Sequence, residues 1–198
     1  MIMFSTQEYL DKKTGPYGIP RDSYLRLIVD EYKTSSTLSA KQQVMANLAN
    51  FAYDPINLQY LKELQVLDIF LDALCEQEDA SLIEYAVHGI CNLCAYPPNR
   101  DYFITNGGIQ LLQKQLSSEE RETVVTSITA LISLLPAGSE SIPYGLVATM
   151  LRFSNSHIAR IANVAKVFLA DCCSKSQKDA ASVELQQWNE QGMAPQTL

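Results

Sequence analysis

Three residues whose side chains can bind metal follow one another at a spacing of three: His88, Cys91 and Cys94. Imidazole and thiolate groups are zinc ligands, and this spacing places all three along one side of a predicted helix. A structural zinc usually needs four ligands from two separated pairs, and the fourth here would have to be Cys75 or His157. The pattern favours small side chains packed between helices, so we expect neither a metal nor another cofactor.

The residue combinations that support nucleophilic catalysis do not occur in this chain. His88 and His157 are the two histidines, and neither lies near a Gly-x-Ser-x-Gly turn. The pair Gly107-Gly108 is not followed by the Lys and Ser or Thr of a phosphate-binding loop, so we interpret it as a junction between helices. We therefore expect a protein that is not an enzyme and has no small-molecule substrate.

The charge balance bears on the class of partner. Among 198 residues, 15 basic and 22 acidic side chains leave a formal net charge of −7. This excess of acid disfavours sequence-independent binding to nucleic acid, which draws its energy from Lys and Arg. We expect no membrane association, because no run approaches the roughly 18 apolar residues of a spanning helix. Five cysteines, an odd number, favour a reducing compartment, the nucleus or the cytoplasm.

An internal repeat indicates the fold. The stretch ANLANFAYDP at 46–55 returns as HGICNLCAYP at 88–97, so that Asn50 corresponds to Asn92, 42 positions further on. At the same offset Pro55 corresponds to Pro97 and Asn57 to Asn99. A period of this length is typical of helical solenoids of the armadillo or HEAT kind.

Apolar residues recur at helical spacing within each copy and predict the helices of the repeat. We expect helices over about 21–32, 40–53, 57–64, 66–74, 81–93, 109–116, 124–134, 144–153 and 158–173, with Ser39 as an N-cap. These predict an all-α, right-handed armadillo-type superhelical solenoid of about three to four repeats at 21–173. We expect a flexible arm at 1–20, because it is rich in Gly and Pro. The polar tail at 174–198 should be disordered, with at best a marginal helix.

Polar residues share one side of the helices that end each repeat. We expect these residues to form a concave ridge that contacts a partner: Asn47, Asn50, Tyr85, His88, Asn92, Tyr96, Thr126 and Ser133. An Asn amide offers both a donor and an acceptor, so it can pair with the backbone of an extended peptide. Alternatively, Asn50 and Asn92 satisfy carbonyl groups between repeats. The sequence leaves both interpretations open.

Basic residues gather towards the C-terminal end of the predicted solenoid. Arg152, Arg160 and Lys166 are followed by Lys175 and Lys178. The first three could contact RNA phosphate or an acidic partner. The alternative is an ordinary solvated helix face.

Several motifs carry a resemblance to a known family. Ala46 with Asn50-Phe51, Asn92-Leu93 and Gly107-Gly108-Ile109 are similar to the pattern of armadillo repeats. More narrowly, the run VMANLANFAYDPINLQYLKELQVLDIFLDAL, then ICNLC and MLRFS, resemble the armadillo-repeat-containing protein seven family over roughly 24–173. Nuclear-import adaptors place Trp one turn before each groove Asn, where this chain has Ala46 and His88, so capture of basic localisation signals is disfavoured.

The family resemblance implies a specific role. It implies a non-catalytic adaptor that pairs with an RNA-recognition-motif protein of the RNA-binding motif protein forty-eight type and acts in splicing by the minor spliceosome. The expected location is then nuclear, with a cytoplasmic fraction not excluded, and any contact with small nuclear RNA is indirect or local. The alternative is a generic armadillo scaffold that binds an extended peptide of a cytoplasmic partner.

Overall fold

The structure, a computed structural model, describes residues 4–76, 79–135 and 142–190, and every regular element in these ranges is a helix. The chain divides into two compact units, Met1–Asn99 and Arg100–Leu198. We refer to them as the N-terminal and C-terminal units. Within the described ranges, none of the helices combines the length and the apolar character needed to cross a membrane.

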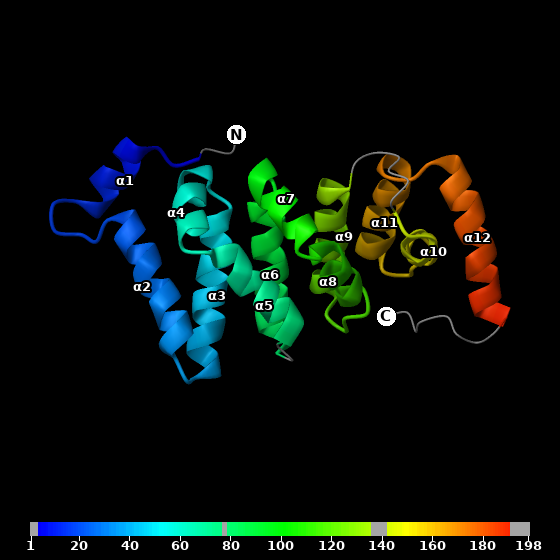
Figure 1. The fold of residues 1–198 in the computed structure, drawn as a ribbon, viewed down its shortest axis with the longest axis horizontal. Helices are drawn as coiled ribbons and strands as arrows, with labels where there is room; N and C mark the ends of the chain where they lie inside the picture. Colours follow the sequence, from blue (N-terminus) through cyan, green and yellow to red (C-terminus); the bar gives the residue numbers. More distant parts are fainter. Residues whose placement is uncertain (1–3, 77–78, 136–141, 191–198) are drawn as a thin grey trace. The chain divides into compact units, whose positions relative to one another are not determined.

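The N-terminal unit is built on three long helices. Helix α3 packs against α2 and α6, α5 packs against α6, and α4 packs against α5 (Figure 1). The bounds are α1 Gln7–Thr14, α2 Arg21–Thr34, α3 Leu38–Ala52, η1 Pro55–Asn57, α4 Leu58–Glu63, α5 Val66–Glu76 and α6 Ala80–Leu93. Helix α7, Pro97–Thr105, begins in this unit and ends in the next.

The close approach of α5 and α6 depends on a glycine. A Cβ atom added to Gly89 of α6 would overlap the ring of Phe70, which is fully buried on α5. Leu48 of α3 and Ile90 of α6 are also fully buried. The core between α5 and α6 is therefore closely packed at Gly89, where a side chain would overlap the ring of Phe70.

The ends of α3 and α6 are fixed by side chains. Thr37 caps α3, its hydroxyl accepting a hydrogen bond from the Ala40 amide at 3.4 Å, so the predicted cap at Ser39 is wrong by two residues. Ser39 lies inside the first turn because the helix starts at Leu38. Asp79 caps α6 by accepting from the Leu82 amide at 2.9 Å, and its carboxylate also accepts from the Gln42 amide group of α3.

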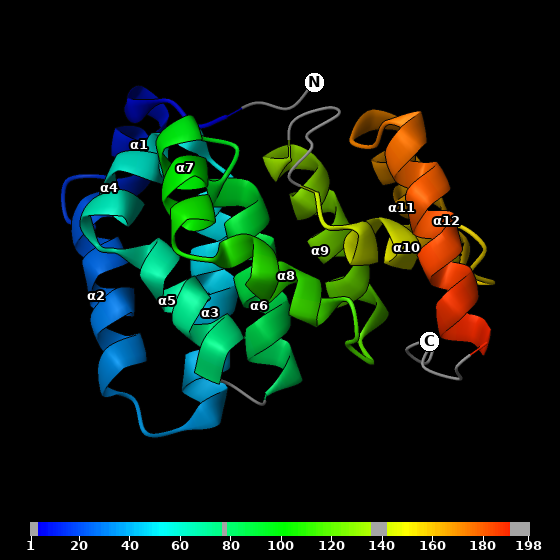
Figure 2. The same ribbon diagram turned by 45° about the vertical axis from the view of Figure 1, so that its right-hand side comes forward.

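The C-terminal unit contains the helices α8 Gly108–Gln115, α9 Arg121–Leu134, α10 Tyr144–Phe153, α11 Ala159–Asp171 and α12 Lys175–Glu190. Helix α9 packs against α8 and α11, and α10 packs against α11 and α12 (Figure 2). Gly107 adopts a left-handed backbone conformation, with φ of 77°, immediately before α8. The predicted helix junction at Gly107-Gly108 is confirmed, because L-residues with side chains rarely adopt this conformation.

Two helices lie in segments for which the sequence predicted little order. Helix α1 falls within the predicted arm at 1–20, and its Leu10 is only 3% exposed. Helix α12 falls within the predicted tail at 174–198 and packs against α10, with Ala181 buried. Residues 1–3 of the arm and 191–198 of the tail lie outside the described ranges. The predicted all-α fold is confirmed, because every regular element of the described residues is a helix.

Candidate functional site

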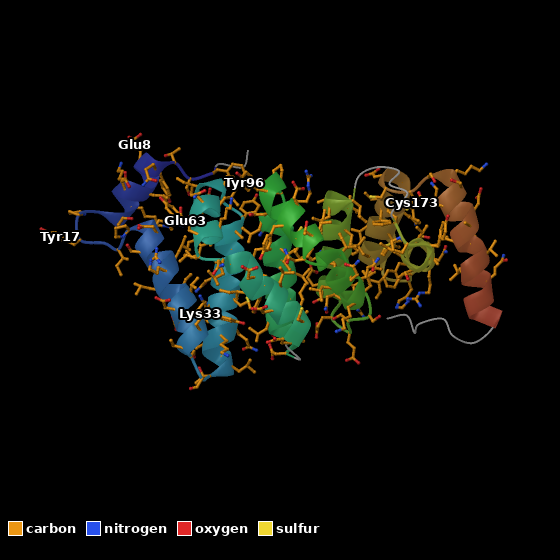
Figure 3. The ribbon with its side chains drawn as sticks, viewed as in Figure 1. Glu8, Tyr17, Lys33, Glu63, Tyr96 and Cys173 are labelled. Atoms are coloured by element: carbon orange, nitrogen blue, oxygen red, sulfur yellow. The ribbon has the colours of Figure 1, made fainter. Side chains whose placement is uncertain are left out.

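The predicted ridge is divided between the two units. Asn47 and Asn50 lie on α3, the ridge residues of the second copy lie on α6 or just beyond it, and Thr126 and Ser133 lie on α9 of the C-terminal unit. Because α3 packs against α6, five members share two neighbouring helices of the N-terminal unit: Asn47, Asn50, Tyr85, His88 and Asn92. Tyr96, labelled in Figure 3, follows the end of α6 and is 41% exposed.

Asn92 connects the two ridge helices. Its Nδ2 group donates a hydrogen bond to the carbonyl oxygen of Ala49 on α3 at 3.1 Å. That carbonyl lies in the last turn of α3, where the Tyr53 amide bonds to the Asn50 carbonyl instead. Asn92 thus satisfies an acceptor that the helix end leaves open, as the inter-repeat interpretation predicts.

Asn50 differs from Asn92 although the two residues correspond in the repeat. Its side chain is exposed and has no hydrogen-bond partner among the described residues. Asn47, one turn earlier, accepts a hydrogen bond from the Gln43 amide group at 3.4 Å. In the N-terminal unit the Asn50 amide is therefore the ridge amide whose donor and acceptor groups both face solvent.

A second repeated pair of asparagines has a structural role that the sequence analysis did not assign. The Nδ2 group of Asn57 donates to the carbonyl of Phe51 at 2.8 Å, and that of Asn99 donates to Leu93 at 3.1 Å. Both side chains are buried, with residue exposures of 0% and 7%. Each closes the C-terminal end of the preceding helix, α3 or α6. Their shared 42-residue offset was the signal for this role.

The residues of the metal-like motif are packed on α6 and at its end. Cys94 is buried, as is Ala52, its counterpart in the first copy. Cys91 is half-buried, and burial raises the pKa of its thiol, which keeps the group protonated and neutral. Within the described ranges no three His, Cys, Asp or Glu side chains converge as a metal site would require. Packing of small side chains accounts for Cys91 and Cys94.

The three basic residues proposed for RNA or an acidic partner lie in different surroundings. Arg160 of α11 donates two hydrogen bonds to the Glu122 carboxylate of α9, at 2.6 and 2.9 Å, and this pairing raises its pKa. Arg152 is half-buried, its guanidinium 5.2 Å from the centre of the Phe153 ring, and desolvation lowers its pKa. Lys166 is exposed. A phosphate group would have to compete with the Glu122 carboxylate for Arg160.

A pocket that the sequence analysis did not predict lies in the N-terminal unit. It has a volume of about 310 Å³ and is lined from the ends of α3 and α6 by Tyr53, Cys91, Asn92 and Tyr96, with Leu58 of α4 and Phe4 of the N-terminal segment among its other walls. Two of these residues, Asn92 and Tyr96, also belong to the ridge. The exposed aromatic residues at the helix ends were a signal in the sequence, but their meeting depends on the fold.

Comparisons with known proteins agree with this architecture. No protein-family model matches the chain. A mouse protein (Mus musculus), armadillo repeat-containing protein 7, is 47% identical over 169 residues, which cover 83% of this chain and 84% of the mouse protein. At this identity and coverage the relationship extends well beyond a shared fold.

Solved structures of designed armadillo repeat proteins are similar in fold. One, solved in complex with the peptide (KR)4, has a TM-score of 0.69 and 16% identity, covering 84% of this chain and 73% of that protein. Another, designed for modular peptide recognition, has a TM-score of 0.66 and 19% identity, covering 86% and 71%. The chain belongs to the armadillo repeat-containing protein 7 family.

Proposed function

We propose that this chain is a non-catalytic adaptor that pairs directly with an RNA-recognition-motif protein and acts in the nucleus, in pre-mRNA splicing by the minor spliceosome. Membership of an armadillo repeat family supports a protein-binding scaffold. The observation that carries the proposal furthest is the polar face shared by α3 and α6, where Asn50 offers an exposed amide and Asn92 and Tyr96 line an apolar pocket.

The charge of the chain supports a protein partner over direct RNA binding. The formal net charge is −7, and of the three basic residues considered, Arg160 is held by Glu122. Binding to phosphate draws its energy from cations that displace counterions. In this proposal the partner carries the RNA contact, and contact between this chain and small nuclear RNA is indirect or local.

A tagged pull-down from nuclear extract, with and without ribonuclease, tests this proposal. We expect an RNA-recognition-motif protein of the minor spliceosome to be recovered in both arms, because a direct protein contact survives digestion of RNA. The Asn50→Ala variant should recover less of it, whereas Asn155→Ala, an exposed asparagine of the C-terminal unit, serves as the matched control. Loss of the protein after ribonuclease, or recovery of no splicing component, would contradict the proposal.

A second candidate function is a scaffold that binds an extended peptide of a cytoplasmic partner. The observation that favours it is the likeness to designed armadillo proteins, one of which was solved with a bound peptide. In that case the Asn50→Ala variant should lose most of its binding, since a single peptide backbone would depend on few amides. A folded partner would contact a broader surface and lose less.

A further inference from the structure

The pocket beside the ridge is apolar and small. Its walls include three aromatic side chains, Phe4, Tyr53 and Tyr96, together with Leu58 and the neutral thiol of Cys91. Its volume of about 310 Å³ is at the lower end of the range for ligand pockets, roughly 300–1,000 Å³. A pocket of this size and lining suits one large side chain better than a folded element of a partner.

The chain's own N-terminal segment shows which chemistry the rim of this pocket accepts. The Phe4 ring lies 6.0 Å from the Tyr53 ring, centre to centre, with an angle of 52° between the planes. The next residue, Ser5, donates its backbone amide to the carboxylate of Asp54 at 3.2 Å. An aromatic side chain followed by a backbone donor is thus already bound at the end of α3.

The pocket is continuous with the polar face of the ridge. Asn92 lines it, and because one hydrogen of its Nδ2 group is bound to Ala49, its oxygen Oδ1 and the second Nδ2 hydrogen are the groups it can offer to a partner. Asn50 lies one turn before Tyr53 on α3. A partner segment that crosses the ridge could therefore pair its backbone with the amides and place one side chain in the pocket.

We propose that this pocket is the anchor site for one aromatic side chain of the partner, carried on an extended segment, with Phe4 forming one wall. The proposal rests on the function proposed above. Aromatic side chains inserted into desolvated pockets commonly dominate the affinity of protein interfaces. The surrounding amides would fix the direction of the segment, while the pocket would supply most of the affinity.

Narrowing the pocket from within tests the proposal. Ala95 is exposed and lines the pocket, so Ala95→Leu reduces the space without removing a core contact. Ala180→Leu, an exposed alanine of α12, is the matched control. The probe is the RNA-recognition-motif protein identified by pull-down, purified and titrated by calorimetry. We expect the Kd to rise at least tenfold for Ala95→Leu and less than twofold for Ala180→Leu.

Thiol alkylation of the unmodified chain provides a second measurement that does not depend on a variant. Cys91 lines the pocket, and Cys75 is exposed elsewhere and serves as the internal reference. Binding of the partner should slow the reaction of Cys91 with iodoacetamide at least fivefold, relative to Cys75. An Ala95→Leu variant that binds normally, or a Cys91 that reacts equally fast in the complex, would overturn the anchor site.

The two proposals fail in different ways. If the wild-type chain does not bind the RNA-recognition-motif protein at all, the proposed function is wrong. If the wild-type chain binds but Ala95→Leu binds equally well, the function stands and the pocket is not its anchor. Circular dichroism of the variants before titration separates a loss of binding from a loss of folding.

Discussion

At the scale of single residues, Gly89 shows how one position controls the packing of two helices. Glycine within a helix costs about 0.5–1 kcal/mol relative to alanine, so alanine would be favoured here by propensity alone. The ring of Phe70 occupies the space that a Cβ atom would need, and that ring is fully buried. Packing therefore opposes propensity at this position.

We predict that Gly89→Ala lowers the free energy of unfolding by about 1–2 kcal/mol, because overpacking typically costs about 1–3 kcal/mol and the gain in helix propensity offsets part of it. Urea denaturation measures the change. Phe70→Leu should relieve the overlap, so the double variant should lose less stability than the sum of the two single changes. Strict additivity would contradict the assigned contact.

The thiol of Cys173, which follows α11, gives a pH-dependent prediction. Burial, with a contribution from Cys172 that Lys178 partly offsets, raises its pKa to about 11. In the unfolded chain a thiol has a pKa of about 8.5, so above this pH the unfolded state loses a proton that the folded state retains. Its contribution to stability is complete below about pH 8.5 and is lost as the pH rises towards the folded-state pKa.

Urea titrations at pH 8, 9.5 and 10.5 measure this effect. We expect Cys173→Ala to lose less stability than the wild-type chain over this range, even if it is less stable at pH 8. Cys75→Ala, which removes an exposed thiol, is the control: its free energy of unfolding should change with pH as that of the wild-type chain does. If the free energy of unfolding of Cys173→Ala falls with pH as steeply as that of the wild-type chain, the Cys173 thiol does not retain its proton in the folded state as described.

At the scale of helices, the repeated asparagines close the ends of α3 and α6. Asn57 and Asn99 donate to the Phe51 and Leu93 carbonyls from buried positions. Asn57 also accepts a hydrogen bond from Arg21 of α2 at 3.4 Å. The repeat thus preserves a helix cap as well as a hydrophobic pattern.

We predict that Asn99→Ala lowers the free energy of unfolding by about 0.5–1.5 kcal/mol, the usual net contribution of one hydrogen bond. It removes a buried donor to the Leu93 carbonyl, which keeps only the Tyr96 amide as a partner among the described residues. Asn57→Ala should cost at least as much because it also loses Arg21. Asn106→Ala is the matched control: its side chain bonds to the Tyr102 carbonyl at an exposed site, where water can replace it. Equal losses at positions 99 and 106, followed by chemical denaturation, would contradict the burial argument.

The helices with strong apolar periodicity could be predicted from the sequence, and α1 and α12 could not, for a physical reason. Helix α1 is short and α12 is mostly polar, so both depend on their caps and on packing more than on apolar periodicity. The Thr6 hydroxyl caps α1 by accepting from the Tyr9 amide, and Ser174 and Gln177 form a reciprocal capping box at the start of α12. These signals are present in the sequence, but the surrounding Gly, Pro and polar residues obscured them.

The candidate site was predictable in part. The repeat correctly placed Asn50 and Asn92 on neighbouring helices, yet it could not show that only Asn92 bonds to the matching helix of the preceding copy, α3. The helix preceding α3 is α2, which is not a copy of the repeat, so Asn50 has no equivalent carbonyl partner among the described residues. The pocket depends on Phe4, about 50 positions from Tyr53, and such contacts between distant segments have no local signature.

At the scale of the whole molecule, the chain combines an acidic net charge with helical units whose exposed groups suit protein contacts. A chain of charge −7 should bind RNA weakly on its own. Its association with a splicing particle would then depend on the partner protein. The central claim is accordingly that the contact with the partner is direct and independent of RNA.

The measurement that tests this claim most directly is calorimetry of the purified chain with the purified RNA-recognition-motif protein in buffer free of RNA. We predict a complex of one molecule of each, with an affinity that added small nuclear RNA changes less than threefold. Binding that appears only when RNA is added would contradict the claim and show that RNA bridges the two proteins.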